Sequence, residues 1–160
     1  MLQLKEKELI QKTLKEVAAF LSPPQPLNKD FSNEDLELLY SVATSLHHAG
    51  DTAQAGEIFH QLALSYPLTQ KYWKGIGSCF QSENNWEKAA KAWEMATLIQ
   101  REDPLPYVHL AECCFSMDDA KKGIEALKTA KSLNIKDSKE VTKKIHFLEA
   151  IWCQEEQRGA

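Results

Sequence analysis

Apolar side chains along this chain recur at helical spacing, and the pattern as a whole repeats every 34 residues. Residues 36–69, 70–103 and 104–137 align with one another without a gap. Each unit has a large apolar residue at its fourth place and a large residue followed by a small one at its seventh and eighth. Its second half repeats a small, a large and a further apolar position. The matching residues are Leu39, Trp73 and Tyr107; Val42-Ala43, Ile76-Gly77 and Leu110-Ala111; Ala55, Ala89 and Gly123; Phe59, Trp93 and Leu127; and Leu62, Ala96 and Ala130.

The recurring small residues carry more information than the large ones. A small side chain at a fixed place indicates two helices that pack too closely for a larger group. A helix-turn-helix unit of 34 residues with this size pattern is typical of tetratricopeptide repeats. The sequence therefore predicts an all-α fold, a superhelix of three tandem repeats.

The predicted turns have suitable residues. At the turn inside each unit, a residue type that tolerates a left-handed backbone precedes one whose side chain can cap a helix. Between units, three further cap formers recur, and two prolines fall in a first helical turn, where a missing amide hydrogen costs little. These residues are Gly50-Asp51, Asn84-Asn85 and Asp118-Asp119 within units, and Thr69, Asp103, Asp137, Pro104 and Pro106 between them.

The chain divides into three parts by this pattern. Residues 1–31 are predicted to form an amphipathic helix over 2–21 and a proline-rich connector, and residues 32–137 the three repeats. The first repeat helix is expected over 33–49, with Ser32 and Asp35 as a reciprocal cap and Phe31 against Leu36. Residues 138–160 are predicted to be a C-terminal capping helix, which a repeat stack needs to cover its open end.

The apolar face of the first helix has two interpretations that stay open. It could cover the N-terminal end of the stack, or the stiff proline-rich connector could let it reach a second copy of the chain and form a homodimer. The residues of this dimerisation hypothesis are Leu9, Ile10, Leu14, Val17, Phe20 and Leu21.

Composition narrows the class of protein. Apolar residues make up 43% of the chain, and no apolar run approaches the roughly 20 residues that cross a bilayer. We therefore expect a cytoplasmic protein without a membrane partner. The net charge of −4 argues against nucleic acid as a partner, although residues 121–144 hold eight lysines against three acids. We interpret these lysines as a solvated outer surface, and the four cysteines as small buried apolar residues.

No set of residues indicates an enzyme or a cofactor. The Gly75-Ile76-Gly77 pair lies inside a predicted helix and lacks the third glycine of a phosphate-binding loop. His109 and Cys113 are four residues apart on one predicted helix but have no further ligands at characteristic spacing, so no metal site is predicted.

Function is expected on the concave wall of the superhelix, which the first helix of each repeat lines. If the fourth, seventh, eighth and eleventh places face the core, the second, fifth, ninth and twelfth face the groove. This lining is amphipathic and suits an extended peptide with apolar anchors. The predicted groove residues are Tyr40, Thr44, His47, Lys71, Lys74, Ser78, Gln81, Leu105, Val108, Glu112 and Phe115.

Three segments resemble a known family. Residues 38–43 (Leu-Leu-Tyr-Ser-Val-Ala), 75–81 (Gly-Ile-Gly-Ser-Cys-Phe-Gln) and 109–114 (His-Leu-Ala-Glu-Cys-Cys) are similar to class II chaperones of bacterial type III secretion systems, the SycD/LcrH/IpgC type. The resemblance covers nearly the whole chain. It implies a cytoplasmic chaperone that holds hydrophobic translocator proteins before secretion by gripping a Pro/Val-x-Leu-x-x-Pro segment. Tyr40 matches a groove aromatic of the family, whereas His47 replaces an aromatic found in relatives.

Two other interpretations use the same scaffold. The chain could be an adaptor that joins two folded proteins, or a secretion regulator whose lysine-rich region contacts nucleic acid or the secretion apparatus. A client other than a translocator, such as a gatekeeper protein of the apparatus, also stays open.

Overall fold

A computed structural model of the chain describes residues 5, 8–12, 30–134, 136 and 138–159, with side chains as far as Trp152. All regular elements in these residues are helices, as the sequence predicts. They are α2 (Asn33–His48), α3 (Thr52–Ser65), α4 (Gln70–Ser82), α5 (Trp86–Ile99), α6 (Pro104–Ser116), α7 (Ala120–Leu133) and α8 (Lys139–Gly159). Of the helix predicted over 2–21, residues 5 and 8–12 are described and are helical.

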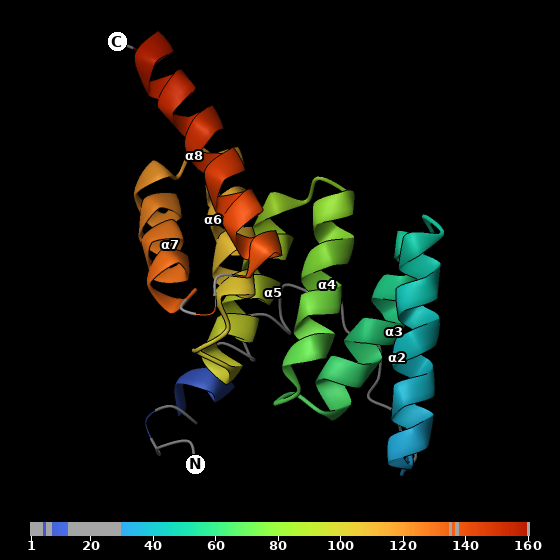
Figure 1. The fold of residues 1–160 in the computed structure, drawn as a ribbon. Helices are drawn as coiled ribbons and strands as arrows, with labels where there is room; N and C mark the ends of the chain where they lie inside the picture. The colour runs from blue at the N-terminus through green and yellow to red at the C-terminus, as the bar shows by residue number, and fades with distance from the viewer. Residues whose placement is uncertain (1–4, 6–7, 13–29, 135, 137, 160) are drawn as a thin grey trace.

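The helices form three antiparallel hairpins, α2–α3, α4–α5 and α6–α7, and each packs on the next (Figure 1). The C-terminal helix α8 follows the third hairpin and packs on α6 and α7. Its last turns extend past the rest of the stack (Figure 1). This arrangement is the tetratricopeptide-type fold that the 34-residue period predicts.

The turns inside the hairpins confirm the predicted backbone. Gly50, Asn84 and Asp118 all adopt a left-handed conformation, with φ of 90°, 56° and 59°. The residue after each of them caps the next helix through its side-chain oxygen. Asp51 accepts from the amide of Gln54, Asn85 from that of Lys88 and Asp119 from that of Lys122, at 3.2, 3.4 and 3.2 Å.

The start of the stack is also capped as expected. Ser32 and Asp35 form a capping box: each side chain accepts a hydrogen bond from the backbone amide of the other. At α6, Asp103 accepts from the amide of Leu105 at 3.0 Å. Thr69 precedes α4 without such a bond, and Asp137 lies outside the described residues.

The small repeat positions lie where neighbouring helices meet. Ala43, Gly77 and Ala111 are all buried. A Cβ placed on Gly77 would lie 2.6 Å from Cε2 of Trp93, so the indole of α5 fills the space that this glycine leaves on α4. The largest fully buried side chains are Trp73, Trp93, Leu62, Ile76, Met95, Val108, Pro106, Cys113 and Cys114.

One repeat position differs from the prediction. The large residue at the seventh place is buried in the second and third units, as Ile76 and Leu110, but Val42 is 42% exposed in the first. Leu38, one turn earlier on α2, is 64% exposed. In the second and third units another hairpin precedes the repeat, whereas α2 opens the stack of described hairpins. The N-terminal end of the stack therefore presents apolar side chains.

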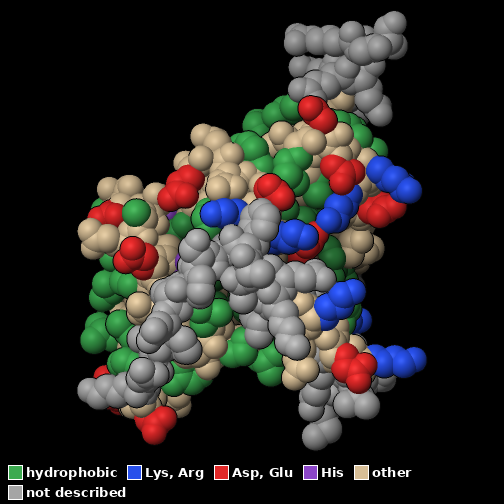
Figure 2. Space-filling model, turned by 180° about the vertical axis from the view of Figure 1, so that it is seen from behind, with side chains coloured by type: hydrophobic (Ala, Val, Ile, Leu, Met, Phe, Trp, Pro, Cys, Tyr) green, Lys and Arg blue, Asp and Glu red, His purple; other side chains and the backbone are tan. Residues whose placement is uncertain are grey.

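The lysine-rich segment is largely solvent-facing, as interpreted from the sequence. Lys121, Lys128, Lys136, Lys139 and Lys143 are exposed. Two further lysines join helices through ion pairs, Lys122 with Glu94 and Lys131 with Glu149. Figure 2 shows that Lys and Arg side chains gather on the half of the rear face formed by the C-terminal helices. No helix among the described residues combines the length and apolar character that crossing a bilayer requires.

Candidate functional site

The first helices of the repeats, α2, α4 and α6, share one face of the stack with α8 (Figure 1). A hollow of about 300 Å³ lies on this face, and side chains from all four helices line it. We call it the central groove. Its lining residues are His47, Ser78, Gln81, Ser82, Trp86, His109, Glu112 and Lys144.

The polar groups of the central groove are held by one another. The amide of Gln81 donates to Oε2 of Glu112 at 3.1 Å, and its carbonyl oxygen accepts from the indole of Trp93 at 2.7 Å. Nε2 of His47 lies 3.1 Å from the hydroxyl of Ser82. These bonds fix the donors and acceptors of the groove across adjacent helices. A ligand therefore meets a preformed polar surface, which lowers the ordering cost of binding.

His109 forms an uncharged aromatic part of the groove wall. Its ring stacks on Trp93 with centroids 4.3 Å apart and planes within 9°. Burial lowers the pKa of His109 to about 3, and the positive charges of Lys144 and Lys74 act in the same direction. The imidazole is therefore neutral at physiological pH. Its Nδ1 atom is buried without a hydrogen-bond partner among the described residues.

The N-terminal end of the same face is built around Tyr40. Its half-buried ring meets Phe59 edge to face at 5.8 Å and lies 6.1 Å from the ring of Tyr72. The ammonium of Lys71 lies 4.5 Å from the centroid of Tyr40 and forms an ion pair with Glu37. The Tyr40 ring thus lies beside a charged pair. This arrangement could contact an apolar side chain of a ligand that has polar groups next to it.

Two of the predicted groove residues, Thr44 and Lys74, bind other groups of the protein through their polar side chains. The hydroxyl of Thr44 donates to the backbone carbonyl of Tyr40 at 2.9 Å. The ammonium of Lys74 lies 2.7 Å from the carboxylate of Asp103, which joins α4 to the cap of α6. In this arrangement both groups have partners before any ligand binds.

The structure brings some predicted residues together and separates others. His47, Ser78, Gln81 and Glu112 line the central groove. Phe115 lies beyond it, in a cleft between α6 and α8. Leu105 lines a separate cavity of about 560 Å³ beside the α7–α8 connection. The prediction for Val108 is wrong: its exposed fraction is 0%, so the fifth place of this unit belongs to the core.

Four groove residues were not predicted: Ser82, Trp86, His109 and Lys144. Ser82 and His109 hold the thirteenth and sixth places of their units, next to places that were assigned to the groove. Extending the rule by one residue on the same helical face would have found them. Lys144 has no such signal, because it holds the seventh place, a core place, when the repeat register is continued into α8.

The residues of the dimerisation hypothesis are only partly described. Leu9 is 43% exposed, whereas Ile10 is buried in the protein's own core and does not present its side chain to a second copy. Leu14, Val17, Phe20 and Leu21 lie outside the described residues. Dimerisation through this helix stays a prediction.

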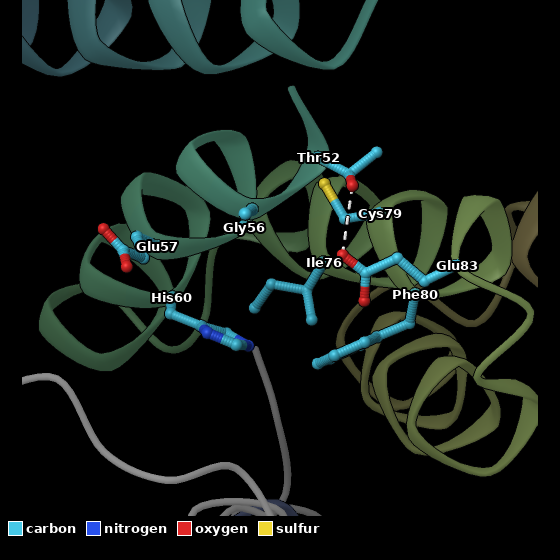
Figure 3. Close-up of a pocket in the computed structure, with 9 residues that line it drawn as sticks. Thr52, Gly56, Glu57, His60, Ile76, Cys79, Phe80 and Glu83 are labelled. Carbon is cyan, nitrogen blue, oxygen red and sulfur yellow. Dashed lines mark hydrogen bonds between the residues drawn. The ribbon is translucent and has the colours of Figure 1, made fainter. Parts of the chain in front are cut away.

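A second hollow, of about 160 Å³, lies between α3 and α4 (Figure 3). Thr52 and Glu83 close one side of it with a 3.1 Å hydrogen bond. Burial raises the pKa of the Cys79 thiol to about 12 and lowers that of His60 to about 4. A protonated thiol is a poor nucleophile, so this hollow has no activated cysteine. Within the described part of the chain, no three His, Cys, Asp or Glu side chains converge to hold a metal ion.

The fold and this face define a class: a helical-repeat protein with an open wall of first helices and a polar groove along it. Solved structures that share this fold include type III secretion translocator chaperones. No family model matches the chain.

Three similar proteins illustrate the match. The Yersinia pestis low calcium response locus protein H is 24% identical over 130 residues, which cover 79% of this chain and 77% of that protein. The Yersinia enterocolitica chaperone SycD, in complex with a peptide of the translocator YopD, aligns with a TM-score of 0.72 at 23% identity and covers 79% of this chain and 99% of SycD. PcrH of Pseudomonas aeruginosa, in complex with the chaperone binding region of PopD, aligns with a TM-score of 0.74 at 23% identity, over 81% of this chain and 99% of PcrH.

Proposed function

We propose that the chain is a chaperone of a bacterial type III secretion system that binds hydrophobic translocator proteins and keeps them competent for secretion. One observation carries the proposal: the chain shares its fold, over about four-fifths of its length, with chaperones whose structures contain segments of their translocators. In this proposal the protein acts in the bacterial cytoplasm and catalyses no reaction.

The concave face suits such a client. A protein destined for a membrane aggregates in water unless its apolar segments are covered. The central groove supplies fixed donors and acceptors for the backbone of an extended segment, and Tyr40 supplies an apolar surface at one end. Binding of the client to the folded chaperone then follows mass action and needs no nucleotide.

The ligand expected in the groove is an extended segment with apolar anchors, of the Pro/Val-x-Leu-x-x-Pro kind that the family resemblance implies. An extended chain leaves its carbonyls and amides free for the groove, whereas a helix uses them internally. Three repeats span only a short segment. Affinity in the micromolar range, about −8 kcal/mol, is therefore expected for an isolated peptide.

Replacing Tyr40 with alanine tests the proposal. The Tyr40→Ala variant is expected to bind synthetic Pro-x-Leu-x-x-Pro peptides from the translocators of the producing bacterium at least about fivefold more weakly. Isothermal titration measures the affinity, and circular dichroism checks the helical fold. Ser41→Ala is the matched control, since Ser41 is an exposed neighbour on the same helix.

Two results would contradict the function. The first is wild-type protein that binds none of these peptides and does not raise the soluble yield of a co-expressed translocator. The second is a Tyr40→Ala variant with unchanged affinity and a normal fold, which would remove this end of the concave face from the binding site.

A further inference from the structure

We propose that the cleft between α6 and α8 is a second anchor pocket, which holds an apolar side chain of the same client segment that crosses the central groove. This inference rests on the proposed function and adds a binding site at the C-terminal end of the concave face. We call it the α6–α8 cleft. It has a volume of about 200 Å³ and is lined by Glu112, Phe115, Ser116, Phe147, Leu148, Ile151 and Trp152.

The outer side of the cleft consists of large apolar side chains that are exposed to solvent. Phe147 is 61% exposed and Ile151 is 42% exposed, and they are one turn apart on α8. Their neighbour Leu148 is buried, so α8 uses one apolar stripe for the core and shows a second one to solvent. Exposed large apolar side chains that line a pocket together indicate a contact surface.

The floor of the cleft is formed by two stacked aromatic rings. The rings of Phe115 and Trp152 stack with centroids 4.4 Å apart and planes within 23°. Phe115 also rests on Gly123 of α7, where an added Cβ would lie 2.4 Å from Cε1 of the ring. Three helices thus hold one aromatic surface at the base of the cleft.

An unused hydrogen-bond donor indicates which kind of ligand fits. The indole nitrogen of Trp152 is buried and has no acceptor among the described residues. A buried donor without a partner is costly. A small rotation of the indole that brings its nitrogen to a ligand acceptor in the cleft would remove this cost. The backbone carbonyls of an extended peptide are free to accept, whereas those of a helix are already bonded within the helix. The donor therefore favours an extended segment over a helix from a second copy.

The cleft continues directly from the central groove. Glu112 lines both, and the ammonium of Lys144 on α8 lies 3.8 Å from its carboxylate. Packed helices lie about 8–10 Å apart, so an extended chain crosses from α6 to α8 in about three residues. A segment that lies over Gln81 and Glu112 thus reaches the cleft within the same short stretch.

The test uses the full chain and its client. A tagged translocator from the producing bacterium is co-expressed with equal amounts of wild-type chaperone and one variant. The ratio of the two chaperones in the pull-down, read by mass spectrometry, gives their relative affinity. The double variant Phe147→Ala/Ile151→Ala is expected to be retained about tenfold less than wild type. Leu68→Ala is the matched control, because Leu68 is an apolar side chain with 55% exposure that lines neither the groove nor the cleft.

A second variant separates binding from folding. Trp152→Phe keeps an aromatic ring on Phe115 but removes the indole donor. Its thermal unfolding midpoint is expected to stay unchanged or rise, because an unpaired buried donor is gone, while its retention falls about threefold. A loss of stability with unchanged retention would assign Trp152 a purely structural role and overturn its part in binding.

The outcomes distinguish a failure of this inference from a failure of the proposed chaperone function. If the double variant is retained like wild type while Tyr40→Ala is depleted, the cleft is not an anchor pocket and the chaperone function stands. If the translocator retains no wild-type chaperone, the proposed function fails and the inference fails with it. Selective depletion of the double variant and of Trp152→Phe, with Leu68→Ala unaffected, supports the cleft.

Discussion

Replacing Trp93 with alanine is expected to lower the free energy of unfolding by about 3–5 kcal/mol, the usual cost of emptying a buried aromatic site. Only 1% of Trp93 is exposed. Its ring stacks on His109, its indole donates to Gln81, and it fills the space above Gly77. One side chain of α5 thus joins α4 to α6. No neighbour can fill the space that it leaves without moving a helix.

Urea unfolding followed by circular dichroism measures this loss. Trp86→Ala is the matched control: Trp86 is also on α5, but it is half-buried at the start of the helix and lines the central groove. Its truncation is expected to cost at least about 2 kcal/mol less, because the site is open to water and leaves no closed cavity. Equal losses for the two variants would mean that Trp93 does not join the hairpins as described.

The Gly77→Ala variant is expected to destabilise the protein by about 1–3 kcal/mol, even though alanine is the better helix former by about 1 kcal/mol. The added methyl group would lie 2.6 Å from Trp93, a distance that real contacts do not reach. Trp93 is enclosed, with 1% of its surface exposed. The two helices must therefore separate, or the indole must leave its position.

The matched control for this variant is Gly56→Ala in α3. The nearest atom to its added methyl is Cβ of Cys79 at 4.0 Å, an ordinary contact. With no clash, the gain in helix propensity remains, and the variant is expected to be more stable by about 0.5–1 kcal/mol. Thermal and urea unfolding measure the change in stability of both variants. The two changes have opposite signs if close packing of helices is the reason for the small residue at this repeat position. The same sign for both would contradict that explanation.

The stack could be predicted because its determinants are local and repeated. Left-handed turn residues such as Asn84, cap formers such as Asp51 and tightly packed positions such as Gly77 each follow from a residue type at a fixed place. The first repeat shows the limit of this reasoning. Val42 holds a core place, yet it is exposed because no described hairpin precedes α2. A repeat pattern predicts which face of a helix can pack against another hairpin, but not whether that hairpin is present.

The candidate binding face is harder to predict, because it depends on how the helices are placed. His47, Ser78, Gln81 and Glu112 come from three helices and meet in one groove, as repeat geometry predicts. Val108 holds the fifth place of its unit, as Tyr40 does in the first, but is fully buried. The position of α8, and with it the contributions of Lys144 and of the α6–α8 cleft, follows from tertiary packing that the 34-residue register does not encode.

Hydrogen exchange of the protein with and without its co-purified translocator tests the central claim most directly, since we propose that the client binds the wall formed by α2, α4, α6 and α8. The account predicts that amide exchange slows most in these four helices, and that α3, α5 and α7 change least. Protection concentrated in α3, α5 and α7 instead, with the first helices unchanged, would place the client on the opposite face and contradict the account.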